Sequence, residues 1–331
     1  MLKTEWKCYV NMQVKDLIKS KVSLAPMAGI TDYVLRSLIR EHSATCLLTT
    51  EMISSEALTQ VKDTDIVARD KNHSPISYQL SGHKPKMMAD SAEYLQKFAD
   101  MIDINMGCPV NKVVKGTDGC ALMRNVELAQ EIVRTVKSQI SIPLSVKFRL
   151  GYTFDELNFV EYGQKMQEAG ADFITIHGRT RSQMYGGKAD WKKIAELKRN
   201  IDIPVFANGD VTSIETAIQC LEESQADGVA IGRGILGDPT LIARIEHYLT
   251  NGEYLPPPTL EEKIENMKKL LLKEMEFRGE IIGLKFVRKF YPYYVNGFTG
   301  ASRLRGELVL MDNPNEIIKT LDNILVAKSL A

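Results

Sequence analysis

Eight short β-type segments alternate with amphipathic segments along this chain, and this alternation restricts its fold more than any other feature. The predicted strands are 22–26, 45–50, 75–80, 101–105, 143–148, 172–177, 203–207 and 227–231. Segments 127–136, 159–169, 191–198 and 214–221 carry apolar residues at helical spacing. Eight strands, each followed by a helix, predict an α/β fold of the (β/α)8 TIM-barrel class, which takes about 250 residues. A doubly wound parallel sheet is the alternative.

The chain has 331 residues, more than the roughly 250–300 at which a single core stops growing, so we expect a second, smaller domain. Three consecutive prolines at 256–258 interrupt the chain. They predict a catalytic barrel over 1–254 and a small C-terminal helical domain over 255–331. Thr259 and Glu262 form a capping-box pattern at the start of that domain. Further helices are expected from Ile282 and from Pro314.

Composition excludes several classes of protein. Lys and Arg total 42 and Asp and Glu also total 42, so any site for a polyanion must be local. Five cysteines without a C-x-x-C motif argue against a disulfide framework and a zinc site, and no metal is predicted. No apolar run approaches the roughly 18 residues of a membrane span, and the first ten residues lack a signal-peptide core. These features predict a cytoplasmic protein without an obligate protein partner.

The segment Asp103-Ile-Asn-Met-Gly-Cys-Pro109 is the most informative short motif. A short apolar run ends at Asn105, which is the pattern of a buried strand that delivers an amide and a thiol into a turn. Gly107 permits a ligand to approach closely, and Pro109 restrains the loop. The motif therefore indicates that Cys108 is a catalytic residue. A buried structural thiol is the alternative.

Polar residues and glycines follow every predicted strand. In chain order they are Met27 and Gly29; Glu51; Gln79 and Gly82; Asn105 and Cys108; Lys147 and Arg149; His177, Gly178 and Arg179; Asn208, Gly209 and Asp210; Gly232, Arg233 and Gly234. The carboxyl ends of barrel strands meet at one face, so these residues are expected to form one site. The loops after strands seven and eight are where barrels commonly bind phosphate through backbone N–H groups. They predict a phosphate-bearing cofactor, although glycines that serve only tight turns are an alternative.

Lys147 stands inside an apolar strand, where an ammonium group is costly to bury without a partner. A flavin ring would provide one, since a cation beside it stabilises its reduced, anionic form. A Schiff-base lysine and an internal salt bridge are the alternatives. His177 is open to two interpretations, a ligand contact or a core imidazole.

The C-terminal region mixes cations with aromatic residues. Lys285, Arg288, Lys289, Arg303 and Arg305 lie among Phe290, Tyr291, Tyr293, Tyr294 and Phe298. Such a mixture suits RNA, because cations bind phosphates and aromatic rings stack on bases. A solvated basic face over an aromatic core is the alternative.

Seven motifs together carry a family resemblance. They are Ala25-Pro-Met-Ala-Gly-Ile-Thr-Asp32, Glu51-Met52, Asp103-Ile-Asn-Met-Gly-Cys-Pro109, Val146-Lys-Phe-Arg149, Ile176-His-Gly-Arg-Thr-Arg181, Ala207-Asn-Gly-Asp210 and Ile231-Gly-Arg-Gly234. From about residue 20 to 310 the chain resembles the tRNA-dihydrouridine synthases, most closely their bacterial B-type subgroup. Two positions depart from the family pattern: Thr240 replaces a usual aromatic residue, and Cys120 stands where serine is common.

The resemblance implies an FMN-dependent enzyme that uses NADPH to reduce specific uridines of tRNA to 5,6-dihydrouridine, with Cys108 as the proton donor to C5. The positions that it assigns to the cofactor are Pro26, Met27, Ala28, Gln79, Lys147, His177, Asn208, Gly209, Asp210, Gly232 and Arg233. Those that it and the basic cluster assign to the substrate are Asn105, Arg179, Arg288, Lys289, Arg303 and Arg305. A free-pyrimidine flavoenzyme, such as a dihydroorotate dehydrogenase, and a barrel without redox chemistry are the rival interpretations.

Overall fold

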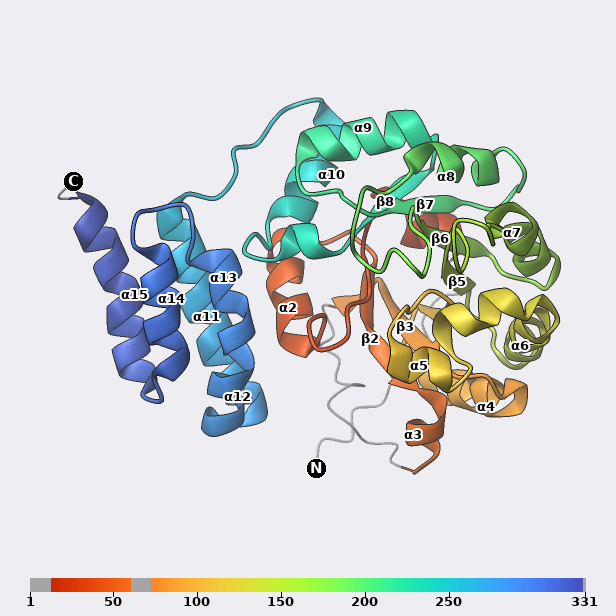
Figure 1. Cartoon of the computed structure of the whole chain (residues 1–331), viewed down its shortest axis with the longest axis horizontal. Coiled ribbons are helices and arrows are strands. Elements are labelled where there is room, and N and C mark those ends of the chain that lie inside the picture. The colour runs from red at the N-terminus through yellow and green to blue at the C-terminus, as the bar shows by residue number, and fades with distance from the viewer. Residues whose placement is uncertain (1–12, 61–72, 330–331) are drawn as a thin grey trace.

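The computed structural model describes residues 13–60 and 73–329. Its centre is a parallel sheet closed into a barrel with helices outside (Figure 1). The strands are β1 Val22–Leu24, β2 Leu48–Ser54, β3 Ile76–Ser81, β4 Met101–Asn105, β5 Leu144–Arg149, β6 Phe173–His177, β7 Val205–Asn208 and β8 Gly228–Ile231. From β2 to β8 each strand pairs with the next, β1 pairs with β8, and a single parallel bridge from Ser23 to Leu47 connects β1 with the residue before β2. The predicted TIM-barrel class is confirmed.

The helices of the barrel are α1 Val14–Leu17, α2 Tyr33–His42, α3 Ser55–Gln60, α4 Pro85–Leu95, α5 Asn111–Lys115, α6 Val126–Gln139, α7 Phe159–Glu168, α8 Trp191–Lys198, α9 Ile214–Ser224 and α10 Leu241–Asn251, with 3-10 turns η3 Gly119–Arg124 and η4 Arg233–Ile235. Most helices of the barrel lie between consecutive strands, whereas α1 precedes β1 and α10 follows β8. The four helices predicted from apolar spacing correspond to α6, α7, α8 and α9. Within the described ranges, no helix is long and apolar enough to span a membrane.

The prediction for the second strand, 45–50, was wrong in its bounds. The ladder with β3 begins at Leu48 and continues through a register shift to Ser54. Glu51 is polar, and the expectation that it would end the strand therefore placed the end too early. The strand tolerates Glu51 because its carboxylate accepts a hydrogen bond from the N–H of Gly29 in the β1–α2 loop.

An extended segment after α10 leads to a C-terminal helical bundle, which we call the tail (Figure 1). Its elements are α11 Leu260–Arg278, α12 Glu280–Val287, η5 Arg288–Phe290, α13 Tyr291–Tyr294, α14 Ala301–Leu310 and α15 Pro314–Ser329. The predicted capping box is confirmed: Thr259 Oγ1 accepts from the N–H of Glu262 at 3.2 Å, and the Glu262 carboxylate accepts from the N–H of Thr259 at 2.7 Å. Helix α14 was not predicted.

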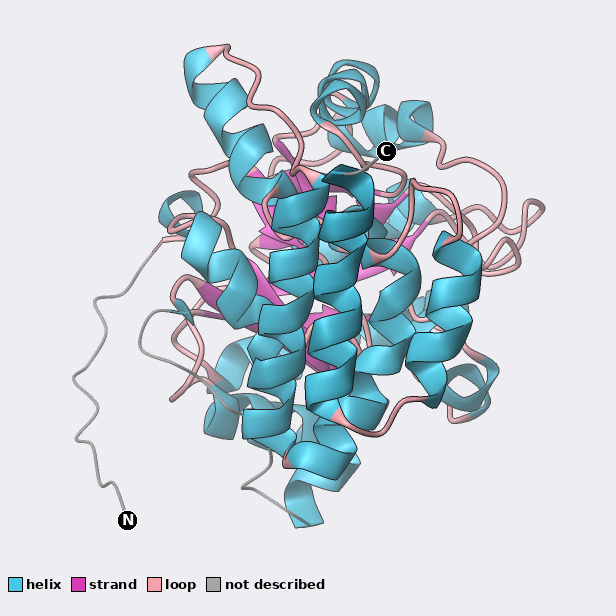
Figure 2. Ribbon diagram, turned by 90° about the vertical axis from the view of Figure 1, so that its left-hand side faces the viewer, coloured by secondary structure: helices cyan, strands magenta, loops and turns pink. Residues whose placement is uncertain are grey.

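The tail has its own apolar core, to which α2 of the barrel contributes Val34 and Leu38. Seen from the tail side, its helices stand next to one another in front of the barrel (Figure 2). Phe290, Tyr291 and Tyr294 are buried in this core. These three rings therefore do not form the base-stacking surface that the aromatic composition suggested, because helical spacing turns them inward.

Candidate active site

A cavity of about 680 Å³ opens where the barrel strands end. It is lined by Asn105 and Cys108 and by every residue predicted to bind the cofactor: Pro26, Met27, Ala28, Gln79, Lys147, His177, Asn208, Gly209, Asp210, Gly232 and Arg233. The barrel thus brings these residues together from β1, β3, β4, β5, β6, β7 and β8 and the loops that follow them. In the part of the chain that the structure describes, no group of three or more His, Cys, Asp or Glu side chains is placed to hold a metal ion.

The loop after β4 holds Cys108 through a side-chain amide. Asn105 Oδ1 accepts hydrogen bonds from the N–H groups of Gly107, at 3.2 Å, and Cys108, at 2.9 Å. Residue 107 must be small, since a Cβ there would lie 3.2 Å from the Cα of Phe148. The loop is therefore fixed by the amide and by close backbone packing, and the thiol reaches the cavity.

Burial raises the pKa of the Cys108 thiol, while the backbone N–H of Val110 and the charge of Arg149 act in the opposite direction. An ordinary thiol has a pKa of about 8.5 and is already mostly protonated at neutral pH. A higher value makes Cys108 a proton carrier at pH 7 and leaves little thiolate for nucleophilic attack.

Lys147 points from β5 toward Asn208 at the end of β7. Its Nζ donates to Asn208 Oδ1 at 3.0 Å, and Asn208 Nδ2 donates to the carbonyl oxygen of Ala230 at 2.7 Å. Burial, followed by the charge of Arg149, lowers the pKa of Lys147 to about 8. An ammonium group has three donors, so a ligand in the cavity can still accept hydrogen bonds from this cation.

Arg179 is buried, with 1% of its surface exposed, and does not line the cavity. Its guanidinium donates to both carboxylate oxygens of Asp210, at 2.8 and 2.7 Å, and to His177 Nε2 at 3.2 Å. A guanidinium only donates, so Nε2 of His177 accepts and the ring proton lies on Nδ1. Burial lowers the pKa of His177, which keeps the ring neutral. This geometry makes Arg179 a support for Asp210 and His177, in place of the predicted direct substrate contact.

The glycines after β7 and β8 differ in what limits them. Gly209 has φ +118°, and a Cβ there would lie 2.8 Å from the Cβ of Ala189 and 2.9 Å from Cδ2 of His177. At Gly232 a Cβ would meet no atom closer than 3.6 Å, so this position has room for a ligand. The neighbouring Arg233 side chain is 52% exposed and lies 3.5 Å from Asp210. It is available to an anionic ligand.

Three more of the lining residues are Arg149, which was expected at this face but given no role from the sequence, and Tyr185 and Tyr293, which were not expected there. Arg149 Nε donates to the carbonyl oxygen of Gly107 at 2.9 Å and so braces the Cys108 loop. Its position at the end of a strand was the available signal. Tyr185 and Tyr293 also line the cavity, and Tyr293 comes from the tail. No local sequence pattern indicates that contribution, because it depends on how the tail docks.

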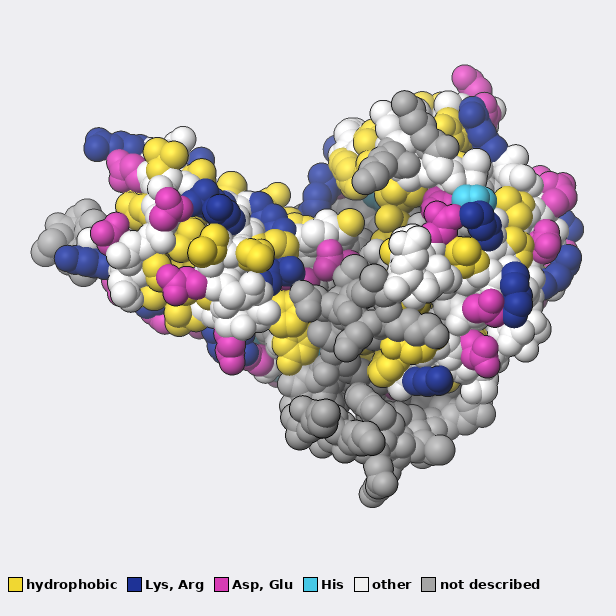
Figure 3. Space-filling model, turned by 90° about the horizontal axis from the view of Figure 1, so that it is seen from below, with side chains coloured by type: hydrophobic (Ala, Val, Ile, Leu, Met, Phe, Trp, Pro, Cys, Tyr) yellow, Lys and Arg dark blue, Asp and Glu magenta, His cyan; other side chains and the backbone are white. Residues whose placement is uncertain are grey.

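The four tail cations predicted to bind tRNA do not line the cavity. Arg288 pairs with Asp312 at 2.6 Å, and Lys289 donates to the carbonyl oxygen of Gly29. Arg303 pairs with Glu307 at 2.9 Å and is 88% exposed, and Arg305 donates to the carbonyl oxygen of Val295 at 2.9 Å. Cationic and anionic side chains are mixed on the face shown in Figure 3, so a site for a polyanion requires a local arrangement.

Comparisons with known proteins identify the family of this chain. The family described as "Dihydrouridine synthase (Dus)" matches residues 23–329. A probable tRNA-dihydrouridine synthase 1 from Synechocystis sp. is 40% identical over 315 residues, which cover 95% of this chain and 88% of that protein. A tRNA-dihydrouridine synthase B from Shewanella oneidensis is 37% identical over 284 residues, covering 84% of this chain and 87% of that protein.

Two solved structures share the fold alone. A 2-naphthoyl-CoA reductase in complex with 2-naphthoyl-CoA gives a TM-score of 0.54 at 10% sequence identity. The match covers 70% of this chain and 50% of the reductase chain. A variant of NCR from Zymomonas mobilis gives a TM-score of 0.50 at 16% sequence identity. That match covers 73% of this chain and 90% of the NCR chain. The family match extends over nearly the whole described chain and includes the Cys108 loop, Lys147 and the glycine loops. The chain therefore belongs to the dihydrouridine synthase family.

Proposed function

We propose that this chain reduces specific uridines of tRNA to 5,6-dihydrouridine, with FMN as its cofactor and NADPH as the electron donor. The observation that carries the proposal is the presence of a protonated thiol, Cys108, and a buried cation, Lys147, in the walls of one cavity. The names of the relatives, which specify tRNA-dihydrouridine synthesis, support this substrate. The composition still predicts a cytoplasmic location.

The residues present fit FMN. Ligand cavities in proteins are about 300–1,000 Å³, and this one, at about 680 Å³, is in that range. Pro26, Met27 and Ala28 supply one wall, and Lys147 supplies a cation with unused donors for the ring. Gly232 leaves space beside Arg233, which suits the phosphate end.

When bound, reduced FMN would supply a hydride, that is one proton with two electrons, to C6 of the uracil. The protein must then provide a proton at C5. Cys108 Sγ holds that proton because burial raises its pKa. Asn105 keeps the Cys108 loop in place through the N–H groups of Gly107 and Cys108, so the thiol is oriented before substrate enters.

A uridine in folded tRNA must leave its stack to enter such a cavity, which costs a few kcal/mol. Contacts to phosphates elsewhere on the RNA can offset this cost. Of the four predicted tail cations Arg303 is the most available, because its side chain is 88% exposed and pairs with Glu307 of its own helix, and Arg305 lies close to it in the same helix.

The test is to incubate the purified protein with FMN, NADPH and unmodified tRNA, and to measure dihydrouridine by mass spectrometry of digested RNA. We expect FMN to bind without a covalent bond and dihydrouridine to form at defined positions. Free uracil and orotate serve as the comparison substrates. A protein that binds FMN but reduces only the free pyrimidines would instead support the small-molecule flavoenzyme.

A further inference from the structure

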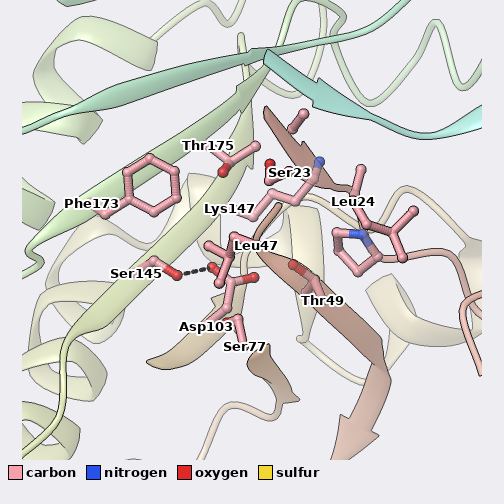
Figure 4. A pocket seen from close by; sticks show the side chains of 13 residues that line it. Ser23, Leu24, Leu47, Thr49, Ser77, Asp103, Ser145, Lys147, Phe173 and Thr175 are labelled. Carbon is pink, nitrogen blue, oxygen red and sulfur yellow. Dashed lines mark hydrogen bonds between the residues drawn. The ribbon is translucent and has the colours of Figure 1, made fainter. Parts of the chain in front are cut away.

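The interior of the barrel below the main cavity is polar. Figure 4 shows a small cavity lined by Ser23, Thr49, Ser77, Asp103, Ser145, Lys147 and Thr175, together with Leu24, Ala25, Pro26, Leu47, Phe173 and Ala230. Its volume is about 10 Å³, and it shares Lys147 with the main cavity. Asp103, with 4% of its surface exposed, carries a carboxyl group into this layer. A buried carboxyl group requires hydrogen-bond partners.

Four side chains connect this layer to the Cys108 loop. Ser145 Oγ donates to Asp103 Oδ1 at 2.6 Å (Figure 4), and Gln79 Nε2 donates to Asp103 Oδ2 at 2.6 Å. Asn105 Nδ2 donates to Gln79 Oε1 at 2.8 Å. Asn105 Oδ1 then accepts from the N–H groups of Gly107 and Cys108. All four of these side chains are buried.

The directions of the amide hydrogen bonds in this series follow from the loop at one end. Backbone N–H groups only donate, so the oxygen of Asn105 must face the loop and its nitrogen must face Gln79. Gln79 therefore turns its oxygen to Asn105 and its nitrogen to residue 103. That residue must accept this bond, and it also accepts from Ser145. The two carboxyl oxygens of Asp103 meet both requirements; burial raises the pKa of this carboxyl group, and the hydrogen bonds from Ser145 and Gln79 act in the opposite direction.

We propose that Asp103 is a positioning residue: it sets the orientation of the Gln79 and Asn105 amides and thereby holds the backbone of the loop that carries the Cys108 thiol. The proposal rests on the proposed role of Cys108 as the proton donor. It concerns the loop before any cofactor or substrate is bound, and so it can be tested on the free protein. An amide that loses its acceptor can rotate by half a turn and place NH₂ against the loop N–H groups, which would release the loop.

The test compares Asp103→Leu with Asp103→Asn. Leu has a similar shape and no acceptor, whereas Asn retains one acceptor for Gln79. In the free protein, we expect Asp103→Leu to speed amide hydrogen exchange at Gly107 and Cys108 at least tenfold and to change the alkylation rate of Cys108 by iodoacetamide. Asp103→Asn should restore both rates to within about threefold of wild type. Quantifying the Cys108 peptide by mass spectrometry separates it from the other thiols.

Ser77→Ala is the matched control. Ser77 lines the same small cavity, and its hydroxyl makes no hydrogen bond among the residues that the structure describes. It should leave exchange and alkylation unchanged. Gln79→Leu should reproduce the Asp103→Leu phenotype, and the double variant should be no worse than either single variant, since both interrupt the same series.

Wild-type exchange and alkylation in Asp103→Leu, or a double variant whose effects simply add, would overturn the proposal. If Asp103→Leu does not fold, Gln79→Leu and Asp103→Asn decide the question by the same two measurements. Neither measurement uses FMN or tRNA. A wild-type protein that fails to form dihydrouridine would therefore refute the proposed function and leave the assignment of Asp103 to be judged on its own data.

Discussion

Cys108 and Lys147 face the same cavity, and burial favours the neutral form of both. For the thiol this means a raised pKa and a retained proton. For the lysine it means a pKa lowered to about 8, so that the amino group holds its proton less firmly than it would in water. Burial helps a proton donor to keep its proton. A buried lysine, in contrast, stays charged more readily when an anionic or strongly polarised ligand lies beside it.

Cys108→Ala is expected to lower dihydrouridine formation by about 10² to 10⁴, the usual contribution of a general acid. Reduction of bound flavin by NADPH should persist, because it precedes proton transfer. Stopped-flow absorbance measures flavin reduction, and digestion of the tRNA measures the product.

Cys46→Ala, Cys120→Ala and Cys220→Ala are the controls for that experiment, because all three residues are buried and none lines the main cavity. They should retain both half-reactions. A Cys108→Ala enzyme that formed product at the wild-type rate would transfer the role of acid to another group.

The affinity for FMN should depend on pH through Lys147. Below about pH 7 the lysine of the free protein is charged and the affinity should be constant. Above its pKa of about 8, binding must include uptake of a proton, so the affinity should fall by up to tenfold per pH unit. Fluorescence titration between pH 6 and 9 measures this, and Lys147→Met should bind more weakly and without that slope. A constant wild-type affinity over the same range would mean that the ligand does not bind the lysine as a cation.

At the scale of elements, the turn η5 and the helix α14 present the tail cations differently. Lys289 of η5 donates to Gly29 in the β1–α2 loop and lies over the ring of Phe286. Arg288 is paired with Asp312. The Arg303 side chain of α14 is 88% exposed, and among the described residues its ion pair is with Glu307, one turn further along the same helix. A surface pair of this kind is weak and can be exchanged for a phosphate.

We therefore expect Arg303→Ala/Arg305→Ala to weaken tRNA binding more than Arg288→Ala/Lys289→Ala. Each lost phosphate contact should flatten the logarithmic salt dependence by a little under about one unit. The tRNA affinity measured against salt concentration gives the slope of this dependence. Flavin reduction by NADPH checks that the Arg303→Ala/Arg305→Ala variant keeps the barrel intact. Wild-type affinity and slope in both pairs would place the tRNA contacts elsewhere, with Arg181 on the barrel rim as the next candidate.

At the scale of the whole molecule, buried charges join the barrel to the tail. Arg278 of α11 donates to Asp32, which caps α2, at 2.5 Å and to Glu274 at 2.8 Å. Glu274 is fully buried, and burial followed by the charge of Asp32 raises its pKa to about 8. Asp32 ends the loop that supplies Met27 and Ala28 to the cavity. The joint is therefore continuous with one wall of the site.

Glu274 makes the stability of the folded protein depend on pH. Its pKa is higher in the folded chain than in the unfolded chain, so the stabilisation is complete below about pH 4.5 and is lost as pH rises through about 8. Each pH unit in that interval weakens the fold by up to about 1.4 kcal/mol. Urea unfolding between pH 6 and 9 should show this decline in wild type. Glu274→Gln should show a smaller decline, and equal slopes in the two proteins would mean that Glu274 is ionised throughout.

The sequence predicted three features that follow from local spacing: the alternation of strands and helices, the residues after each strand, and the Cys108 loop. Parallel strands in a barrel end at one face, so most residues named at the strand ends line the cavity, although some, such as Glu51, Gly82 and Arg179, do not. The capping box at Thr259 was predictable for the same reason, since its partners are three residues apart.

The tertiary structure alone decided which polar groups remain free. Arg179 is hydrogen-bonded to Asp210, 31 residues away, and Gln79 is hydrogen-bonded to Asp103, 24 residues away. Tyr293 reaches the cavity from the tail, whereas Tyr291 and Tyr294 turn into the tail core. A charged or aromatic residue has the same local pattern whether it meets solvent, substrate or a distant part of the chain. Its role is set by desolvation and by the acceptors that folding brings to it, and these depend on contacts that local spacing does not encode.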